Sequence, residues 1–314
     1  MVNYYISENN LLRTAETPCD GCWISLIAPS ESELTDISQK FSIDANDLKS
    51  ALDMDERSRI EAEENYTMIL VNIPTLEEDT EKELYDTIPL AIFVSPRNIL
   101  TVCSEETPVL QAFIQQKVKD FNTTLKSRFV MQILYRTASL YLLYLRNIEK
   151  QSELLENKLH HSTQNSALFE LLKLEKSLVY FTTSLRSNEV VMEKLFKNER
   201  FKKYPEDAEL LEDVIVENKQ AIEMANIYNG IINSMSGTFA SVISNNLNTV
   251  MKTLAIVTIV LSIPTMIFSA YGMNVSTLGM PLAEHPFGFL MIVIASVVLG
   301  LIVTLFFMKN KLFK

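Results

Sequence analysis

The feature that most constrains this chain is an abrupt change in charge near residue 252. Residues 253–314 carry only four charges, namely Glu284, Lys309, Lys311 and Lys314. Within this part, residues 253–271 and 287–308 are uncharged and mostly apolar. A bilayer core of about 30 Å needs roughly 20 such residues in a helix, so each stretch can cross a membrane once. The first 252 residues hold 25 of the 28 basic and 38 of the 39 acidic residues. The sequence therefore predicts a membrane protein with a large acidic soluble part.

The lysines beside the two apolar stretches predict their orientation. Lys252 precedes the first stretch, three lysines follow the second, and residues 272–286 between them contain neither Lys nor Arg. Because basic residues stay on the cytoplasmic side, we expect both termini in the cytoplasm of a multi-pass protein of the cell membrane. Stretches at the C-terminus are not cleaved signal peptides.

The composition and motifs exclude several classes of function. An acidic soluble part argues against nucleic acid, whose phosphates require clustered Lys and Arg. No Gly-rich phosphate loop, nucleophile elbow or zinc motif occurs, so neither an enzyme nor an organic cofactor is expected. Cys19 and Cys22 have the spacing of a redox pair, but they precede a predicted strand rather than a helix. Their spacing alone favours two incidental cysteines beside a turn at Asp20-Gly21.

Residues 1–118 are predicted to form a cytoplasmic α/β domain. Runs rich in Ile, Val and Leu predict strands at 23–27, 67–73, 88–94 and 99–103, and helical patterns fall at 31–41 and 45–52. Ser30 followed by Glu33 is typical of a capped helix start. The acidic stretch 77–83 favours a solvated hairpin loop between two strands.

Residues beyond 109 have apolar residues at intervals of three and four, which indicates helices. We expect a cytoplasmic helical region over 119–205, with helices at about 125–160 and 165–203. No strong helix stop follows Pro205 until Gly272. A single helix over 206–271 would be about 99 Å long and would join a stalk to the first transmembrane span. The expected remainder is an external loop at 272–286, a second span at 287–308 and a basic cytoplasmic tail at 309–314.

The predicted stalk and first span share a face of small and polar residues. Residues 224–251 are uncharged and rich in Asn and Ser. Two series of residues spaced seven apart lie on this face. The first contains Ser234, Ser241, Asn248, Ala255, Ser262 and Ser269. The second, three residues further along, contains Gly237, Ser244, Met251, Thr258 and Thr265. A seven-residue repeat is typical of helices packed around a shared axis, although coiled coils place Leu or Ile there.

Two interpretations of this face remain open. Small residues also permit close helix packing in membranes. A water-lined pore is favoured because the pattern continues from the stalk into the span and includes Asn248, an amide that is costly to bury dry. Two spans cannot enclose a path, so several copies around a symmetry axis are required. Rings of amide and hydroxyl oxygens would hold a hydrated cation weakly, and Met251 and Leu254 would be the narrow apolar positions.

The first span ends in the motif Tyr271-Gly272-Met273-Asn274. With this motif at the end of the first of two C-terminal spans, the chain resembles the CorA family of divalent-cation transporters, whose hallmark is Gly-Met-Asn. Further similarity lies in Asn248-Thr249-Val250-Met251-Lys252, in Pro264-Thr265, in Trp23-Ile24-Ser25-Leu26 with Pro29 and Glu33, and in Asp55-Glu56-Arg57 through Glu61.

The resemblance implies a homopentamer with a cytoplasmic funnel, whose pore is lined by the stalk helix and first span. Asn274 would form a ring at the outer entrance and hydrogen-bond hydrated Mg²⁺, while Gly272 and Met273 shape the turn. The implied pore positions are Asn248, Met251, Leu254, Thr258 and Thr265, and the heptad pattern includes all of them except Leu254. The heptad pattern adds Ser262 and Ser269, and Ser262 departs from the larger apolar residue of some members.

Family members also sense internal Mg²⁺ through carboxylates between neighbouring subunits, and filled sites hold the pore closed. The resemblance places Asp213 at one such position, with partners expected near Glu77, Glu78 and Asp79. Mg²⁺ would then be both substrate and regulatory ligand. Glu284 is the only acid of the external loop and, repeated by symmetry, would concentrate cations at the entrance. An exposed loop charge without a role is the alternative for Glu284.

These features together predict a channel-like transporter for Mg²⁺ influx that is gated by cytoplasmic Mg²⁺. A zinc, cobalt or nickel transporter on the same scaffold remains open. The intact Gly-Met-Asn motif favours Mg²⁺, and the scarcity of thiolate and imidazole along the pore disfavours a softer metal. A membrane-anchored scaffold without transport is the third alternative, in which the polar face would be accidental.

Overall fold

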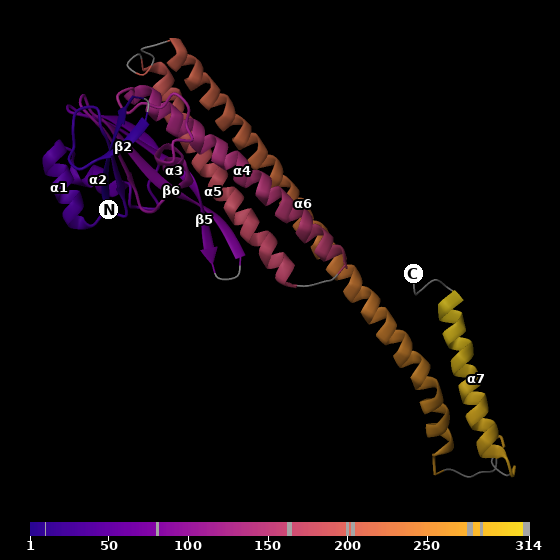
Figure 1. Ribbon diagram of the computed structural model, residues 1–314. Helices are drawn as coiled ribbons and strands as arrows, with labels where there is room; N and C mark the ends of the chain where they lie inside the picture. Colours follow the sequence, from indigo (N-terminus) through magenta and orange to yellow (C-terminus); the bar gives the residue numbers. More distant parts are fainter. Residues whose placement is uncertain are drawn as a thin grey trace. The chain divides into compact units, whose positions relative to one another are not determined.

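The chain divides into two compact units in the computed structural model, Met1–Ser236 and Gly237–Lys314. The structure describes residues 1–9, 11–79, 82–161, 165–198, 201, 205–274, 279–282 and 285–309. The first unit contains a sheet covered by helices, and the second contains the two most apolar helical segments (Figure 1).

The first unit is built on a seven-stranded mixed sheet with the order β2-β1-β3-β7-β6-β5-β4. The strands are β1 (Val2–Glu8), β2 (Leu11–Ala15), β3 (Trp23–Ile27), β4 (Arg59–Ala62), β5 (Thr67–Asp79), β6 (Lys82–Val94) and β7 (Ile99–Cys103). Neighbouring strands are antiparallel except for β3 and β7, which run parallel from the pair Trp23 and Ile99. The predicted α/β class of this part is confirmed.

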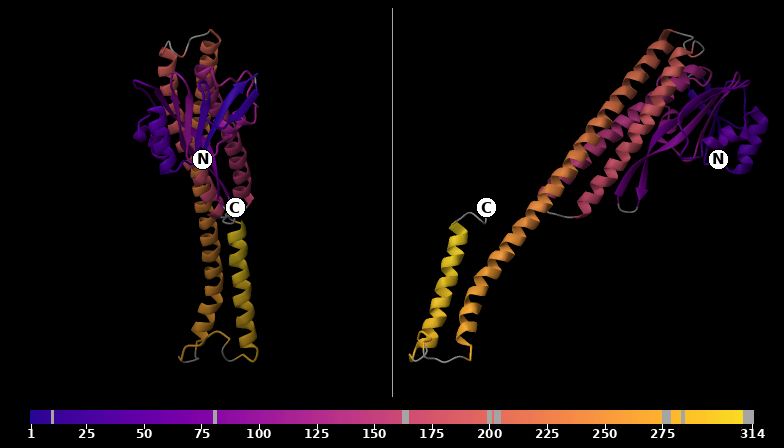
Figure 2. Two further views of the ribbon diagram at one scale, coloured as in Figure 1. Left: turned by 60° about the vertical axis from the view of Figure 1, so that its left-hand side comes forward. Right: turned by 180° about the vertical axis from the view of Figure 1, so that it is seen from behind.

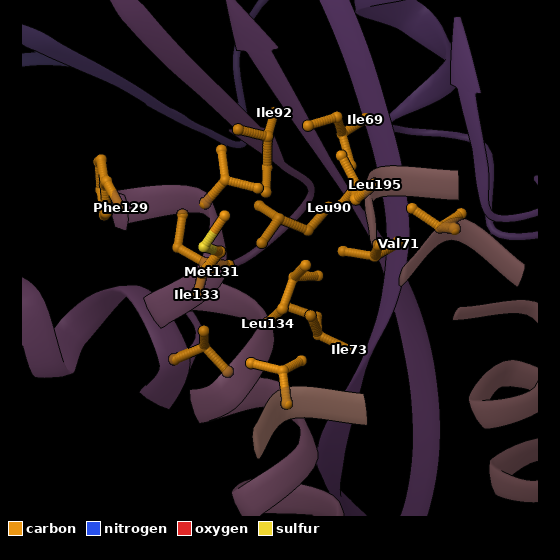
Figure 3. Packing of buried hydrophobic residues seen from close by; sticks show 14 of the residues in the cluster. Ile69, Val71, Ile73, Leu90, Ile92, Phe129, Met131, Ile133, Leu134 and Leu195 are labelled. Carbon is orange, nitrogen blue, oxygen red and sulfur yellow. The ribbon is translucent and has the colours of Figure 1, made fainter. Parts of the chain in front are cut away.

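Helices cover both faces of the sheet. The helices of this unit are α1 (Glu31–Phe41), α2 (Ala45–Ser50), α3 (Pro108–Ile114), α4 (Lys126–His161), α5 (Asn165–Lys197) and the first part of α6 (Pro205–Tyr271). Side chains alternate along a strand, so β5 supplies both cores. Ile69 and Val71 pack with Leu134 of α4 and Leu195 of α5 (Figure 3). The intervening Met68 packs on the other face, in the cluster that includes residues of α1 and α2.

Local patterns in the sequence located several elements correctly. The strands at 23–27 and 99–103 and the helix at 31–41 are confirmed to the residue. Ser30 caps α1, since its hydroxyl accepts from the Glu33 N–H and the Glu33 carboxylate accepts from the Ser30 N–H. The continuous helix expected over 206–271 is confirmed as α6, whereas α5 ends at Lys197 rather than near 203.

The acidic stretch 77–83 lies in a hairpin, but the expectation of a loop was wrong for most of it. The β5–β6 ladder continues to the pair Asp79 and Lys82, while β4 and β7 pair only with its other end. A two-stranded ribbon therefore extends beyond the sheet. Tyr85 anchors it, because its buried ring contacts Tyr144 of α4 and Phe181 of α5. Because the ribbon packs against these helices, it keeps its strand structure in a stretch whose composition favours a loop.

A buried amide fastens α5 to the sheet. Asn188 is fully buried, and its Oδ1 accepts from the Ser58 hydroxyl at 2.8 Å and from the Asn72 N–H at 2.9 Å. Its Nδ2 donates to the Asn72 carbonyl at 2.7 Å. This carbonyl also accepts from the Tyr141 hydroxyl of α4 at 3.0 Å. One side chain thus satisfies the backbone of β5 at a point where two helices meet it.

Replacement of Asn188 by alanine is expected to lower the free energy of unfolding by about 3 kcal/mol, because buried partners lose their hydrogen bonds. The matched control is Asn157→Ala on the exposed surface of α4, which removes a single hydrogen bond to the Glu153 carbonyl. Denaturant unfolding followed by the fluorescence of Trp23 measures both variants. Equal midpoints would contradict the role assigned to Asn188.

The second unit contains the remainder of α6 and α7 (Gly288–Lys309). By length and composition, α6 and the segment Gly288–Phe307 of α7 are the two described helices that could cross a membrane. Within this unit α7 runs back beside α6 in the opposite direction (Figure 2). The predicted pair of C-terminal spans therefore has the expected helical form.

Candidate ion pathway

The predicted pore residues share one face of α6. At 100° per residue, Asn248, Met251, Leu254, Thr258, Ser262, Thr265 and Ser269 fall within an arc of about 120° centred on Met251. We call these seven residues the polar stripe. Six of them are exposed and Ser262 is half-buried. No other part of this unit covers the stripe among the residues that the structure describes.

The covered face of the same helix segment lies on the opposite side. Ile256 is buried there, and Val260, Ile263, Pro264 and Ile267 are half-buried. These positions centre about 165° from the middle of the stripe. The stripe therefore belongs to the surface of α6 that the second unit leaves exposed, opposite the covered face.

The covered face of α7 carries small residues. Ser296 and Gly300 are buried, and Thr304 one turn further on is half-buried. Small residues four apart let two helices approach closely in a membrane. Because α6 and α7 are the long elements of this unit, we infer that their covered faces lie against each other. Within the second unit the small residues on a covered face are therefore those of α7, and contact with α7 does not explain the stripe of α6.

The hydroxyl groups of the stripe present acceptors outward. Thr258 donates to the Leu254 carbonyl at 2.8 Å, Thr265 to the Leu261 carbonyl at 2.9 Å, and Ser262 to the Ile259 carbonyl at 2.8 Å. A hydroxyl whose proton is used in this way retains lone pairs only. Water molecules around a cation point their hydrogens outward, so these oxygens match the surface of a hydrated cation.

The charge along this segment is nearly zero. Residues 224–274 contain no acid and a single basic residue, Lys252. The stripe therefore offers a cation no carboxylate, and neutral oxygens bind cations more weakly than carboxylates do. Met251 and Leu254, both more than half exposed, interrupt the polar positions with apolar surface.

The Gly-Met-Asn motif lies directly after α6. The Gly272 N–H donates to the carbonyls of Phe268 and Ser269, and a Cβ on Gly272 would lie 3.3 Å from the Phe268 oxygen. Met273 and Asn274 follow, and both are exposed. The absence of a side chain at Gly272 lets the chain leave the helix tightly, so that Asn274 stands close to the helix end.

Two contacts hold the described parts of the loop that follows. The Tyr271 hydroxyl donates to the Pro281 carbonyl at 2.8 Å. A Cβ on Gly288 would lie 2.1 Å from the Leu282 oxygen, so the start of α7 accepts only glycine at this approach. The predicted entrance residue Glu284 lies outside the described residues.

The predicted sensor residues lie in the first unit. Asp213 is exposed on α6 between the buried Leu211 and Val214. The backbone of Glu77, Glu78 and Asp79 forms the end of β5 at the tip of the ribbon, and their side chains lie outside the described residues. Asp213 lies near the start of α6, whereas the ribbon tip lies toward the other end of the helical layer (Figures 1 and 2).

Neighbouring acids of α6 serve a structural purpose. Arg128 of α4 donates from Nη2 to Glu206 at 2.8 Å and from Nε to the buried Asp207 at 2.9 Å. Both carboxylates also stand at the helix N-terminus, where negative charge is favoured. Among the described side chains, no three His, Cys, Asp or Glu gather as a metal site would require.

Sequence reasoning did not identify which face of either span packs against the other. In α7 the packed face is marked by the small or polar residues Ser296, Gly300 and Thr304, four apart in a helix whose other residues are mostly large and apolar. For α6 the signal was the row of Ile and Val residues opposite the stripe. Both are visible in the sequence once the partner helix is known.

A soluble α/β unit and a long continuous helix, whose apolar end is followed by a Gly-Met-Asn turn and a second apolar helix, indicate a membrane protein of the transporter class. The family described as CorA-like Mg²⁺ transporter protein matches residues 20–309. The chain therefore belongs to the CorA family, a family of divalent-cation transporters rather than enzymes.

Individual relatives agree with this assignment. The cobalt/magnesium transport protein CorA of Methanocaldococcus jannaschii is 30% identical over 297 residues, which cover 92% of this chain and 90% of the relative. The protein of the same description from Thermotoga maritima is 19% identical, covering 95% and 84%. The complete structure of the CorA magnesium transporter from M. jannaschii aligns with a TM-score of 0.79 at 28% identity, covering 98% of each chain.

Proposed function

We propose that this protein is a channel-like transporter for Mg²⁺ influx, assembled from several copies around an axis along which each chain exposes its polar stripe. The observation that carries the proposal is the position of the stripe, opposite the face of α6 that is covered within its own chain. Two helices cannot surround a path, so the open faces of several copies must do so. A homopentameric funnel is the assembly that the family resemblance implies.

Mg²⁺ fits the chemistry of this face. It gives up its water reluctantly and is held well by oxygen ligands. Neutral amide and hydroxyl acceptors can hold its water shell without stripping it. The three hydroxyls that donate to backbone carbonyls keep their lone pairs for this purpose. The relative from M. jannaschii is described as a cobalt/magnesium transport protein, which supports a divalent cation of this size.

The proposed orientation places both termini in the cytoplasm of a cell-membrane protein and the Gly-Met-Asn turn outside. The lysines that flank the spans support it. An inside-negative potential would then draw cations inward, at about 4.6 kcal/mol for a divalent ion across 100 mV. Asn274 would form the outer ring, and Glu284 would raise the local concentration of cations at the mouth.

Regulation is proposed to involve Asp213 and the acids Glu77, Glu78 and Asp79 of a neighbouring subunit. The start of α6 and the end of β5, which carry these acids, lie apart within one chain (Figure 1), which supports a site shared between chains. Carboxylates are the hard oxygen ligands that Mg²⁺ prefers. Binding of cytoplasmic Mg²⁺ there would hold neighbouring subunits together and keep the pore closed.

Mg²⁺ is expected to protect the protein from protease, and replacement of Asp213 by alanine should weaken this protection. The Mg²⁺ concentration needed for half-protection should rise by about tenfold, since a charged ligand is lost. Glu209→Ala on the same helix is the control, because it removes an exposed acid that the resemblance does not select. Limited proteolysis over a Mg²⁺ series measures the effect. An unchanged midpoint in Asp213→Ala would remove this residue from the sensor.

The proposed function is tested by flux into liposomes that contain the purified protein. Mg²⁺, Zn²⁺, Co²⁺ and Ni²⁺ are compared at one fixed negative potential with an ion-sensitive dye inside. Uptake of Mg²⁺ is the expected result. Uptake of Zn²⁺ without Mg²⁺ would keep the pore and overturn the substrate, and no flux of any ion through an intact oligomer would favour the scaffold alternative.

A further inference from the structure

Cys19 and Cys22 lie at the two ends of a tight turn that precedes β3. The Cys22 N–H donates to the Cys19 carbonyl at 3.2 Å, which closes a four-residue β-turn. Gly21 has a φ of +81°, and Asp20 is not among the residues with positive φ. A negative φ followed by a positive φ at the third position is the type II turn. This turn holds the first and fourth Cα atoms within about 7 Å, and disulfides join Cα atoms about 4.4 to 6.8 Å apart.

The turn is fixed by contacts outside itself. The Gly21 N–H donates to the Arg97 carbonyl at 2.8 Å. A Cβ on Gly21 would lie 3.0 Å from Cγ2 of Thr124, so the turn packs closely against the segment that leads into α4. The Cys22 thiol donates to Oδ1 of the buried Asn98 at 3.7 Å. The sulfur positions are therefore set by the fold and not by a free loop.

The two thiols differ in a way that assigns them different roles. Cys19 is partly exposed, whereas Cys22 is fully buried. Burial raises the pKa of the Cys22 thiol, and this outweighs the lowering by the hydrogen bond from the Cys19 backbone. A small oxidant from solvent reaches Cys19 first, and Cys22 is the nearest sulfur to the product.

We propose that Cys19 and Cys22 form a reversible dithiol–disulfide pair, a modification site in the soluble unit that responds to peroxide. In the first step the Cys19 sulfur attacks one peroxide oxygen, the O–O bond breaks, and a sulfenic acid and one water form. In the second step the Cys22 sulfur attacks the Cys19 sulfur, an S–S bond forms, the S–O bond breaks, and the hydroxide leaves as water with the Cys22 proton. Two thiols and one peroxide give one disulfide and two waters.

Trp23 provides a local readout of the reaction. It follows Cys22 directly, is the only tryptophan of the chain, and is fully buried among Tyr5, Phe113 and Phe129. A disulfide next to an indole quenches its fluorescence. Formation of the pair is therefore visible in the intact protein without a label.

The test treats the full-length protein in detergent with hydrogen peroxide, then unfolds it and alkylates every remaining thiol. The chain has three cysteines. We expect the number of alkylated cysteines to fall from three to one, the peptide spanning residues 19–22 to lose two hydrogens, and Trp23 fluorescence to decrease. Dithiothreitol should reverse all three changes.

Two variants make the test specific. Cys103→Ala removes the distant buried thiol, and the paired loss should persist in it. Cys19→Ser changes the more exposed residue and should leave Cys22 open to alkylation and Trp23 fluorescence constant. Three alkylated cysteines after peroxide would overturn the proposal. Oxidation of Cys19 alone, or a disulfide between chains on a non-reducing gel, would also overturn it.

Discussion

Replacement of Asn274 by alanine is expected to reduce Mg²⁺ uptake to the background of empty liposomes while the oligomer stays intact. The amide stands in the exposed turn directly after α6, where Gly272 lets the chain leave the helix. A hydrogen bond to a charged partner contributes about 1.5 to 3 kcal/mol, and one such bond would be lost in each subunit. About tenfold per subunit at the lower value multiplies around a ring of copies, so little uptake should remain.

The control for Asn274→Ala is His285→Ala, which changes another exposed side chain in the connection between the two spans. It removes a local contact, in which Nδ1 accepts from the Phe287 N–H at 3.2 Å, and leaves the motif intact. Uptake should be retained within a factor of about two. Size-exclusion elution in detergent checks assembly in both variants. Transport in Asn274→Ala equal to that of the parent would reject the entrance ring.

The sequence predicted best those elements whose pattern is local. β3 and β7 are short apolar strands bounded by turns, and α1 carries its own cap at Ser30. β1, β2 and β4 were not predicted, because their residues are half-exposed and mix polar with apolar types. Their strand state depends on hydrogen bonds to neighbours far along the chain, such as Tyr4 to Ile24. Local strand propensity does not predict such a long-range pairing.

The candidate pathway also has a part that the sequence predicts and a part that it does not. The grouping of Asn248, Thr258 and Thr265 on one face follows from the period of a helix and was therefore predictable. What covers the opposite face was not, because α7 is apolar all round and the small residues at 296, 300 and 304 mark a face without naming its partner. The burial of Ile256 and of Ser296 supplies that missing fact. The same burial weakens the alternative in which the polar stripe serves to pack α6 within its own chain.

Replacement of Asn248 by leucine is the sharpest test of whether the polar stripe is wet. Asn248 is exposed at the edge of the stripe, one turn before the apolar Met251. Leucine there would add a third apolar level to those of Met251 and Leu254 in every subunit, and narrow apolar constrictions lose their water. A hydrated divalent cation cannot cross a dry ring without surrendering its shell. We expect Mg²⁺ flux to fall by at least about 100-fold.

A matched control lies two residues away on the same helix. Asn246 is also exposed, but at 100° per residue it falls about 140° from the centre of the stripe, outside its arc. Asn246→Leu therefore makes the same chemical change at nearly the same depth without altering the proposed lining, and flux should stay within about twofold. Equal loss in both variants would indicate damage to the helix or its assembly. Normal flux in Asn248→Leu would mean that this position faces no water, and the stripe would then be a contact between copies whose small residues serve packing.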